Sequence, residues 1–261
     1  MSEISKIVVD AVLQQLHEIE VKHGVRVLYA CESGSRAWGF ASADSDYDVR
    51  FIYSHPREWY LSIDLEHKRD VIEVPINDKL DISGWDLRKA LKLYRKSNPA
   101  LLEWLGSPIV YREHGSLAAR LRELSSASIS LVKCRYHYMH MAQGNFRDYL
   151  KGPEVRLKKY LYVLRPLLAV NWIDAGYGIV PTEFGKLVDA IVQENELRRA
   201  IYDLLEAKKQ GFEQSVGPRI EPISRYIESE MERLIATKPE NVKSTGEPRK
   251  LNELFRAILS E

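Results

Sequence analysis

The first part of the chain contains one helical pattern followed by several strand patterns. Apolar residues in segment 4–23 recur at helical spacing, and Gly24 follows as a stop signal. The pattern then changes to short apolar runs rich in β-branched and aromatic residues, which are typical of strands. These runs cover residues 25–31, 47–53, 71–74 and 80–82. We expect an N-terminal helix followed by four strands of one sheet.

Beyond Asp86 the apolar spacing is helical almost throughout. The expected helices cover residues 87–105, with a break at Asn98-Pro99, and residues 129–150, 155–173, 184–191, 196–208, 223–235 and 251–259. Segment 238–250, rich in Lys, Glu, Pro and Gly, is expected to be an exposed loop.

The order of these elements predicts an α/β (α+β) fold. A small mixed, twisted sheet with flanking helices is expected over residues 1–110, and a mostly helical domain over residues 111–261. The boundary is placed between Gly106 and Glu113, where Ser107-Pro108 interrupts the helical pattern. We expect the helical domain to close one side of a nucleotide-binding cleft.

Composition narrows the class of protein without naming a function. The 261 residues are 45% hydrophobic and 29% charged, which suits a globular protein with a substantial core. The net charge of +1 excludes a bulk positive field, so a nucleic-acid partner would need a local basic patch. Cys31 and Cys134 lie far apart without zinc spacing, and we interpret both as buried, reduced thiols.

Targeting and membrane signals are missing from the sequence. The N-terminus lacks the basic start and apolar run of a secretory signal. No segment approaches the roughly 20 apolar residues of a membrane span. We therefore expect a cytoplasmic protein with no membrane partner. The oligomeric state stays open.

A pair of acidic residues follows a glycine-serine turn. Gly34-Ser35 stands at the end of the first predicted strand, and Asp46 and Asp48 open the second. Side chains at positions i and i+2 of a strand share one face, so the two carboxylates converge. Hard divalent cations such as Mg²⁺ prefer carboxylate and phosphate oxygens as ligands. Asp44 lies in the preceding loop and is interpreted as a turn former.

The neighbouring residues predict a nucleotidyl-transfer site. Gly34 lets the backbone approach a phosphate, and the Ser35 hydroxyl is expected to donate to phosphate oxygens. Asp81, on a later strand, is a candidate third metal ligand and base for an acceptor hydroxyl. Two metal ions held by such carboxylates stabilise both the attacking and the leaving oxygen of an in-line displacement.

These residues resemble the active-site signature of the DNA polymerase beta-type nucleotidyltransferases, over residues 25–86 of this chain. More closely, they resemble the RNA-ligase-associated, RNA repair branch of that superfamily. The similar segments are GSRAWG (34–39), DSDYDVR (44–50), ISGWDLRKAL (82–91) and SNPALLEWL (97–105). The resemblance implies a nucleotidyltransferase fold, an NTP substrate and an RNA end as acceptor.

Several candidate residues have two interpretations. Arg36 is expected to bind the triphosphate, and a surface salt bridge is the alternative. Arg50 shares the carboxylate face and could pair with the acidic residues structurally. Asp81 is favoured as a metal ligand over a turn or helix cap, and Asp86 is the other candidate cap.

Cations in the helical part supply further candidates for nucleotide binding. Lys159 and Arg165 lie near aromatic residues, a composition that suits base stacking and triphosphate neutralisation. An ordinary amphipathic helix explains the same pattern.

The sequence therefore predicts a metal-dependent nucleotidyltransferase. It would transfer a nucleoside monophosphate from an NTP, with ATP preferred, to an acceptor hydroxyl with two Mg²⁺ or Mn²⁺ ions. Asp46, Asp48 and Asp81 are the expected catalytic and metal-binding residues, and Gly34, Ser35, Arg36, Lys159 and Arg165 the expected nucleotide-binding residues. The alternatives are nucleotidylation of a protein hydroxyl, a small-molecule acceptor, and a catalytically silent nucleotide-binding or RNA-binding module.

Overall fold

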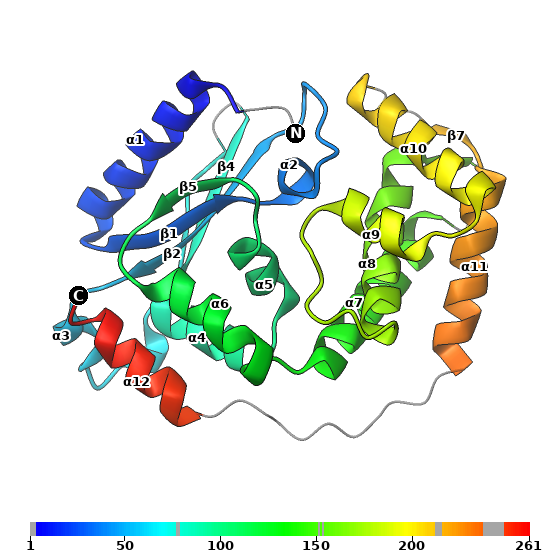
Figure 1. The fold of residues 1–261 in the computed structure, drawn as a ribbon. Coiled ribbons are helices and arrows are strands. Elements are labelled where there is room, and N and C mark those ends of the chain that lie inside the picture. Colours follow the sequence, from blue (N-terminus) through cyan, green and yellow to red (C-terminus); the bar gives the residue numbers. More distant parts are fainter. Residues whose placement is uncertain (1–3, 77–78, 151, 153, 212–215, 237–247) are drawn as a thin grey trace. The chain divides into compact units, whose positions relative to one another are not determined.

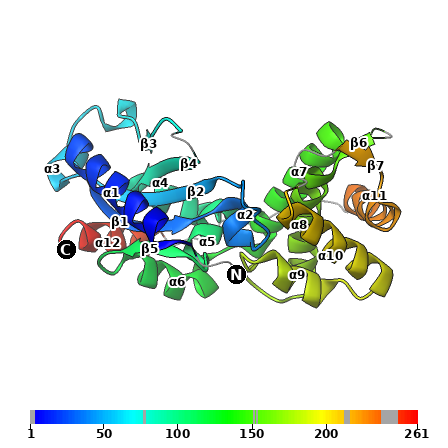
Figure 2. The same ribbon diagram turned by 90° about the horizontal axis from the view of Figure 1, so that it is seen from above.

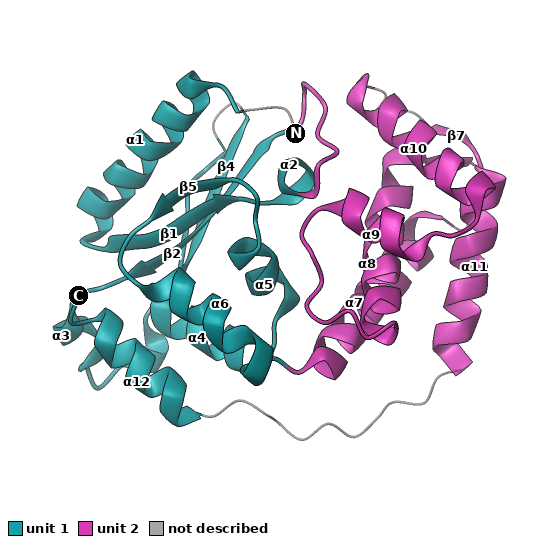
Figure 3. Cartoon of the chain, in the orientation of Figure 1, with its two compact units in different colours: residues 1–37, 46–129, 245–261 teal, residues 38–45, 130–244 magenta. Residues whose placement is uncertain are grey.

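Two compact units make up the chain in the computed structural model, which describes residues 4–76, 79–150, 152, 154–211, 216–236 and 248–261. The first unit contains residues 1–37, 46–129 and 245–261, and the second contains residues 38–45 and 130–244 (Figure 3). Neither unit is therefore a single continuous stretch of sequence.

A five-stranded mixed sheet forms the centre of the first unit (Figure 1). Its strand order is β3-β4-β2-β1-β5. The strands are β1 (Arg26–Glu32), β2 (Tyr47–Ser54), β3 (Val71–Glu73), β4 (Leu80–Asp86) and β5 (Val110–Glu113). Strands β2 and β4 are parallel, whereas the other neighbouring pairs are antiparallel. The predicted mixed sheet is confirmed, with its four expected strands and with β5 as an additional edge strand.

Helices cover both faces of this sheet. The helix α1 (Lys6–His23) buries Val12, Leu16 and Ile19 against one face. The opposite face is covered by α4 (Leu87–Arg95), α5 (Pro99–Leu105), α6 (Leu117–Ser128) and α12 (Pro248–Ile258). The short elements α2 (Gly34–Trp38), α3 (Arg57–Tyr60) and the 3₁₀ turn η1 (Leu65–His67) complete the described part of this unit.

Local signals in the sequence set the helix ends. Gly24 ends α1 in the left-handed conformation at φ 61°, as the sequence predicts. The Asn98 side chain accepts a hydrogen bond from the backbone N–H of Leu101, and Pro99 occupies the first turn of α5. The break expected at Asn98-Pro99 is therefore confirmed, because these residues start a new helix.

The second unit is mostly helical, as predicted. Its helices are α7 (Leu131–Tyr149), α8 (Leu157–Asp174), α9 (Phe184–Ile191), α10 (Asn195–Lys209) and α11 (Glu221–Ala236). Helices α7 and α8 pack along each other (Figure 2). Helix α8 is buried along most of its length, so it forms the centre of this core. Two short strands that the sequence does not predict, β6 (Glu154–Arg156) and β7 (Val216–Pro218), pair beside the helices.

Loop 38–45 belongs to this helical unit. Phe40 is buried and meets the Phe184 ring edge to face, with centroids 5.6 Å apart. Trp38 meets the Tyr162 ring edge to face at 5.8 Å. Two aromatic anchors thus tie the loop to helices that follow it by more than a hundred residues.

The compact units divide the chain differently from the predicted boundary. Strand β5 and α6 lie in the first unit, because Leu117, Ala118 and Leu121 pack in the core beside the sheet. Helix α12 also returns to the first unit through Leu251, Leu254 and Ile258. Of the loop predicted over 238–250, residues 238–247 lie outside the described residues, and 248–250 begin α12. Among the described helices, none has the length and apolar character needed to cross a membrane.

Candidate active site

The turn after β1 lies directly against Asp48. Gly34 has a positive φ of 57°, and a Cβ atom built on it would lie only 2.1 Å from Oδ2 of Asp48. The backbone N–H of Ser33 donates to the carbonyl oxygen of Asp48 at 2.8 Å, and Ser35 is buried next in the turn. Glycine is thus required at this position both by conformation and by close approach.

Two of the predicted carboxylates stand side by side on parallel strands. In the register of β2 and β4, Asp48 is the direct partner of Asp81. Their side chains are 28% and 34% exposed, so both carboxylates remain reachable from solvent. Asp46, two residues before Asp48, is exposed and lies one residue before the start of β2. The pKa of Asp48 is raised, first by burial and then by the nearby charges of Asp81 and Asp46.

Arg50 bridges the carboxylates. Its Nη2 atom donates to Asp48 Oδ1 at 3.0 Å and to Asp81 Oδ2 at 2.8 Å. Its Nη1 atom donates to the carbonyl oxygen of Asp81 at 2.8 Å. Burial raises the pKa of Asp48, and the Arg50 guanidinium opposes this effect. The pairing interpretation of Arg50 is confirmed.

The carboxylate oxygens of Asp48 and Asp81 are chemically suited to a hard divalent cation, but Arg50 already lies between them. Carboxylate oxygens are the ligands that Mg²⁺ prefers. In the described residues, however, no three acidic, histidine or cysteine side chains are gathered closely enough to hold a metal. Arg50 occupies the position between Asp48 and Asp81 and provides the positive charge there. A metal ion at this pair would have to share the carboxylates with Arg50 or displace it.

Arg36 lies beside the acidic strand in the same unit. Its Nε atom donates to the carbonyl oxygen of Asp46 at 3.1 Å, and its guanidinium stacks 3.8 Å from the centre of the Tyr47 ring. The half-buried side chain is held flat by these contacts.

The other predicted cations lie in the helical unit. The Lys159 ammonium sits 3.8 Å from the Tyr149 ring centre and 5.3 Å from that of Tyr162. Arg165 is only 1% exposed, and its guanidinium stacks 4.6 Å from the Trp38 ring. Lys159 is therefore partly open to solvent on an aromatic surface, whereas Arg165 is a core residue that supports the loop containing Trp38.

Glu32 is a candidate residue that the sequence analysis does not identify. Its side chain is buried, with Oε1 accepting the Asp48 backbone N–H at 2.9 Å and Oε2 accepting the Tyr111 hydroxyl. Burial raises the pKa of Glu32 to about 7, and the Asp48 charge adds to this shift. The signal in the sequence is weak, because Tyr111 comes from the unpredicted strand β5.

Two other acidic residues take structural positions. Asp44 lies exposed in the turn between Ser42 and Ser45, consistent with its interpretation as a turn former. Asp86 is the N-cap of α4 and accepts the Arg88 backbone N–H at 2.8 Å. The cap role considered for Asp86 is therefore confirmed. Asp81 lies instead beside Asp48, and together with Asp46 these residues form the acidic group of the candidate site.

Comparisons with known proteins identify the family of this chain. A family model described as the RNA repair pathway DNA polymerase beta family, RlaP, matches residues 8–257. The chain is 49% identical over 251 residues to the uncharacterised protein YcgL of Bacillus subtilis (strain 168), covering 96% of each chain. It is also similar to a solved nucleotidyltransferase-like protein from Exiguobacterium sibiricum 255-15, at 11% identity and a TM-score of 0.31. That match covers 95% of this chain and 89% of the other.

Proposed function

Because the chain belongs to the RNA repair pathway DNA polymerase beta family, we propose that it transfers a nucleoside monophosphate from an NTP to a hydroxyl at an RNA end. The observation that carries this proposal is the contact between the Gly34 turn and Asp48, with Asp81 beside Asp48 on the next strand. The turn that we propose as the phosphate-binding element thus lies directly against the carboxylates.

The chain's own residues supply the binding groups for a triphosphate. The Ser35 hydroxyl and the Arg36 guanidinium bind phosphate oxygens beside the Gly34 turn, where no Cβ atom obstructs the approach. Lys159, half-exposed on two tyrosine rings of the helical unit, stays a prediction of the sequence as a nucleotide-binding residue. Arg165 acts indirectly by supporting Trp38.

The acidic residues take the remaining roles. Asp48 and Asp81, with Asp46 drawn toward them, would hold Mg²⁺ or Mn²⁺ once Arg50 shares or leaves the pair, and the bound metal would neutralise charge on the triphosphate and on the leaving pyrophosphate. Asp81 accepts the proton of the acceptor hydroxyl, whose oxygen forms a bond to the α-phosphorus as the bond to the β-phosphate oxygen breaks. Arg50 keeps Asp48 and Asp81 aligned before the substrate binds.

Substitution of one carboxylate tests the proposal. The protein is incubated with each α-labelled NTP, Mg²⁺ and either bulk RNA or cell protein. The wild type is expected to label RNA, with ATP as the best donor, and Asp48→Asn is expected to abolish labelling. Asp48→Asn should melt at a similar or higher temperature, because it removes a charge that burial disfavours.

Asp44→Asn is the matched control, since it makes the same chemical change in a nearby exposed turn. It should label as the wild type does. Equal labelling by Asp48→Asn and wild type would remove the carboxylates from the mechanism. Labelled protein without labelled RNA would favour a protein hydroxyl as acceptor, and no labelling with any donor would favour a silent binding module.

A further inference from the structure

Helix α4 carries an unusual concentration of positive charge for this chain. Residues 87–96, which comprise α4 and its C-cap, contain five Lys or Arg residues and no acidic residue, whereas the whole chain has a net charge of +1. The apolar residues Leu87, Ala90, Leu91 and Tyr94 face the core. The charged residues are consequently directed to the outside of one helix.

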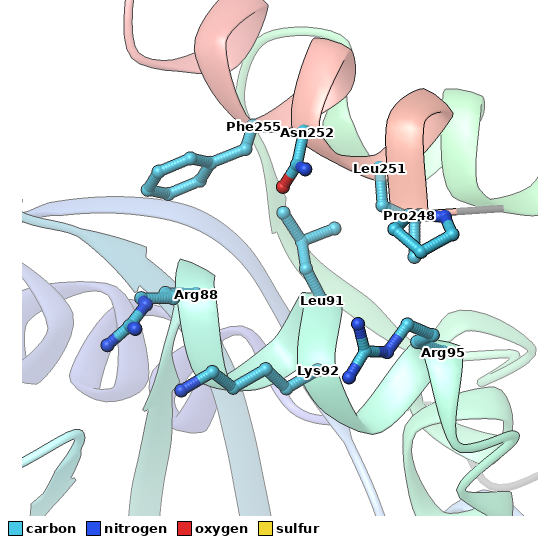
Figure 4. A pocket seen from close by; sticks show the side chains of 8 residues that line it. All are labelled: Arg88, Leu91, Lys92, Arg95, Pro248, Leu251, Asn252 and Phe255. Atoms are coloured by element: carbon cyan, nitrogen blue, oxygen red, sulfur yellow. The ribbon is translucent and has the colours of Figure 1, made fainter. Parts of the chain in front are cut away.

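The cations of α4 line a pocket of about 250 Å³ against α12 (Figure 4). Arg88, Lys92 and Arg95 come from α4, and Figure 4 shows Phe255 and Asn252 on α12 across from them. The pocket is lined in full by Arg88, Leu91, Lys92, Arg95, Pro248, Leu251, Asn252 and Phe255. This α4–α12 pocket combines three cations with an apolar floor and has no acidic lining residue.

Two of these cations are available to a ligand. Arg88 pairs with Glu66 at 2.6 Å, and the neighbouring Lys89 pairs with Asp70 at 2.8 Å. Lys92 and Arg95 are exposed and form no ion pair with any other residue that the structure describes. An exposed pair of cations one helical turn apart can neutralise phosphates that follow one another along a strand.

A neighbouring pocket shares Arg88 and Lys92 with the α4–α12 pocket. It adds Trp59 and Lys68, but its lining also contains acidic residues, namely Glu66, Asp70 and Asp86. The Lys68 ammonium lies 4.9 Å from the centre of the Trp59 ring. The α4–α12 pocket, which has no acidic lining residue, is therefore the one of the two that suits an anionic ligand.

We propose that the α4–α12 pocket binds single-stranded RNA, with phosphates on Lys92 and Arg95 and a base against Phe255. An aromatic ring beside cations is the composition used for unpaired bases. Free phosphate would contact the cations of the pocket but not its apolar floor. Duplex RNA has its bases stacked inside the helix, so no base would be available to contact Phe255. The choice of RNA rests on the proposed function, whereas the anionic, base-bearing character of the ligand rests on the pocket itself.

This site is distinct from the acidic group. Asp81 stands near the start of β4, and α4 begins after the end of that strand at Asp86. At about 3.3 Å per residue, five residues of strand separate the two positions by about 17 Å. The pocket would thus hold a part of the RNA away from its reacting end.

Binding to the full-length protein is measured by fluorescence anisotropy with a labelled single-stranded RNA of about twelve nucleotides. The double variant Lys92→Ala, Arg95→Ala is expected to weaken binding about 10-fold. The slope of log binding constant against log salt concentration should become shallower by about one to two, which corresponds to the loss of about one to two phosphate contacts. The control Lys6→Ala, Lys22→Ala removes the same charge from exposed positions on α1, which covers the other face of the sheet. Equal weakening by both double variants would overturn the proposal.

A variant of the aromatic residue tests the contact with a base. Phe255→Leu keeps an apolar side chain beside Tyr60, and is expected to weaken single-stranded RNA several-fold while leaving inorganic pyrophosphate unaffected. A melting curve checks that the variant remains folded. Tighter binding of pyrophosphate, of duplex RNA or of anionic phospholipid vesicles than of single-stranded RNA would each overturn the assignment.

The Asp48→Asn variant separates this inference from the proposed function. It should bind single-stranded RNA as the wild type does, because Lys92 and Arg95 lie outside the acidic group. Pocket-dependent RNA binding without any labelling would leave the RNA site intact and refute the transferase. Labelling of RNA that is unaffected by Lys92→Ala, Arg95→Ala would refute the RNA site instead.

Discussion

The two ends of the paired strands β2 and β4 carry aspartates in contrasting surroundings. At one end Asp48 and Asp81 stand together, partly exposed, and share Arg50. At the other end Asp86 is 1% exposed and accepts hydrogen bonds from the Tyr60 hydroxyl at 2.7 Å and from the Arg88 N–H. The first end, with Asp48 and Asp81, is the acidic end, where like charges lie close together. The second is the capped end, where the single carboxylate of Asp86 accepts hydrogen bonds from neighbouring donors.

The contrast shows aspartate in two kinds of position, one that fixes local structure and one that leaves the carboxylate open to a ligand. Every oxygen of Asp86 has a partner from the protein, so this carboxylate fixes the start of α4. Asp48 and Asp81 have one shared cation, which leaves oxygens facing solvent for a substrate or metal. Substitutions at the acidic end should therefore change activity, and substitutions at the capped end should change stability.

The largest effect is expected from Gly34→Ala. The added Cβ atom would lie 2.1 Å from Asp48 Oδ2, and the positive φ adds strain. Either the turn or the carboxylate must move by about an ångström, which is expected to lower nucleotidyl transfer at least about 100-fold. Initial rates with labelled ATP and RNA measure this loss.

Gly39→Ala provides the matched control for conformation alone. Gly39 also has a positive φ, of 89°, but nothing lies within 4 Å of its Cβ position. This variant should lose about 1 kcal/mol of stability and keep its rate within a few-fold. A similar rate loss in both variants would show that backbone strain, and not the approach to Asp48, limits activity.

The next effect concerns the capped end. Asp86→Ala removes the cap and leaves the Tyr60 hydroxyl without its acceptor, at an expected cost of about 2–4 kcal/mol. Urea denaturation should reveal this cost. The rate of labelling per folded molecule should not change.

Asp86→Asn is the conservative comparison, because the asparagine carbonyl oxygen can cap the helix while its amide N–H donates to the Tyr60 hydroxyl, which can turn to accept. Burial raises the pKa of Asp86, so replacing the charge should cost under about 1 kcal/mol. If both Asp86 variants abolished labelling while remaining folded, the division between the two ends of β2 and β4 would be wrong.

The smallest effect is a pH dependence at the capped end. The backbone N–H of His55 donates to the Tyr60 hydroxyl at 3.1 Å, and its ring stacks on Trp59. Burial, with the nearby charges of Lys68 and His23, lowers the pKa of His55 from 6.5 to about 4. Between these values the unfolded chain binds a proton that the folded chain does not, so stability falls as the pH falls.

Because the His55 ring is only half-buried, the expected loss between pH 6.5 and pH 4 is about 1 kcal/mol. His55→Phe keeps an aromatic ring on Trp59 and removes the titration. The stability difference between wild type and variant should shift by that amount in favour of the variant as the medium becomes more acidic. A difference independent of pH would contradict the assigned direction.

The strands that carry the acidic group can be predicted because their apolar runs are long and buried. Six of the seven residues of β1 and five of the eight residues of β2 are buried, and these apolar runs produce a strong β signal. Strand β5 has a burial pattern with exposed ends and follows Ser107-Pro108, so its sequence resembles a loop. Its membership in the sheet depends on pairing with β1, which local sequence does not encode.

The residues around the acidic group differ in the same way. Asp48 lies in the strand that its apolar neighbours predict, and Asp46 lies one residue before that strand. The position of Asp81 beside Asp48 depends on a parallel register between strands that are not adjacent in sequence. The role of Glu32 cannot be predicted, because its two partners lie on β2 and β5. The assignment of loop 38–45 to the helical unit depends on Phe184 and Tyr162, far along the chain.

Loop 38–45 has a consequence for how this protein can be divided. The loop joins Gly34-Ser35 to Asp46 in the sequence, yet its two aromatic anchors are inserted in the helical core. An excised sheet domain would carry Trp38 and Phe40 without their packing partners, and an excised helical domain would lack both rings. The two parts must therefore be expressed, inherited and engineered as one piece.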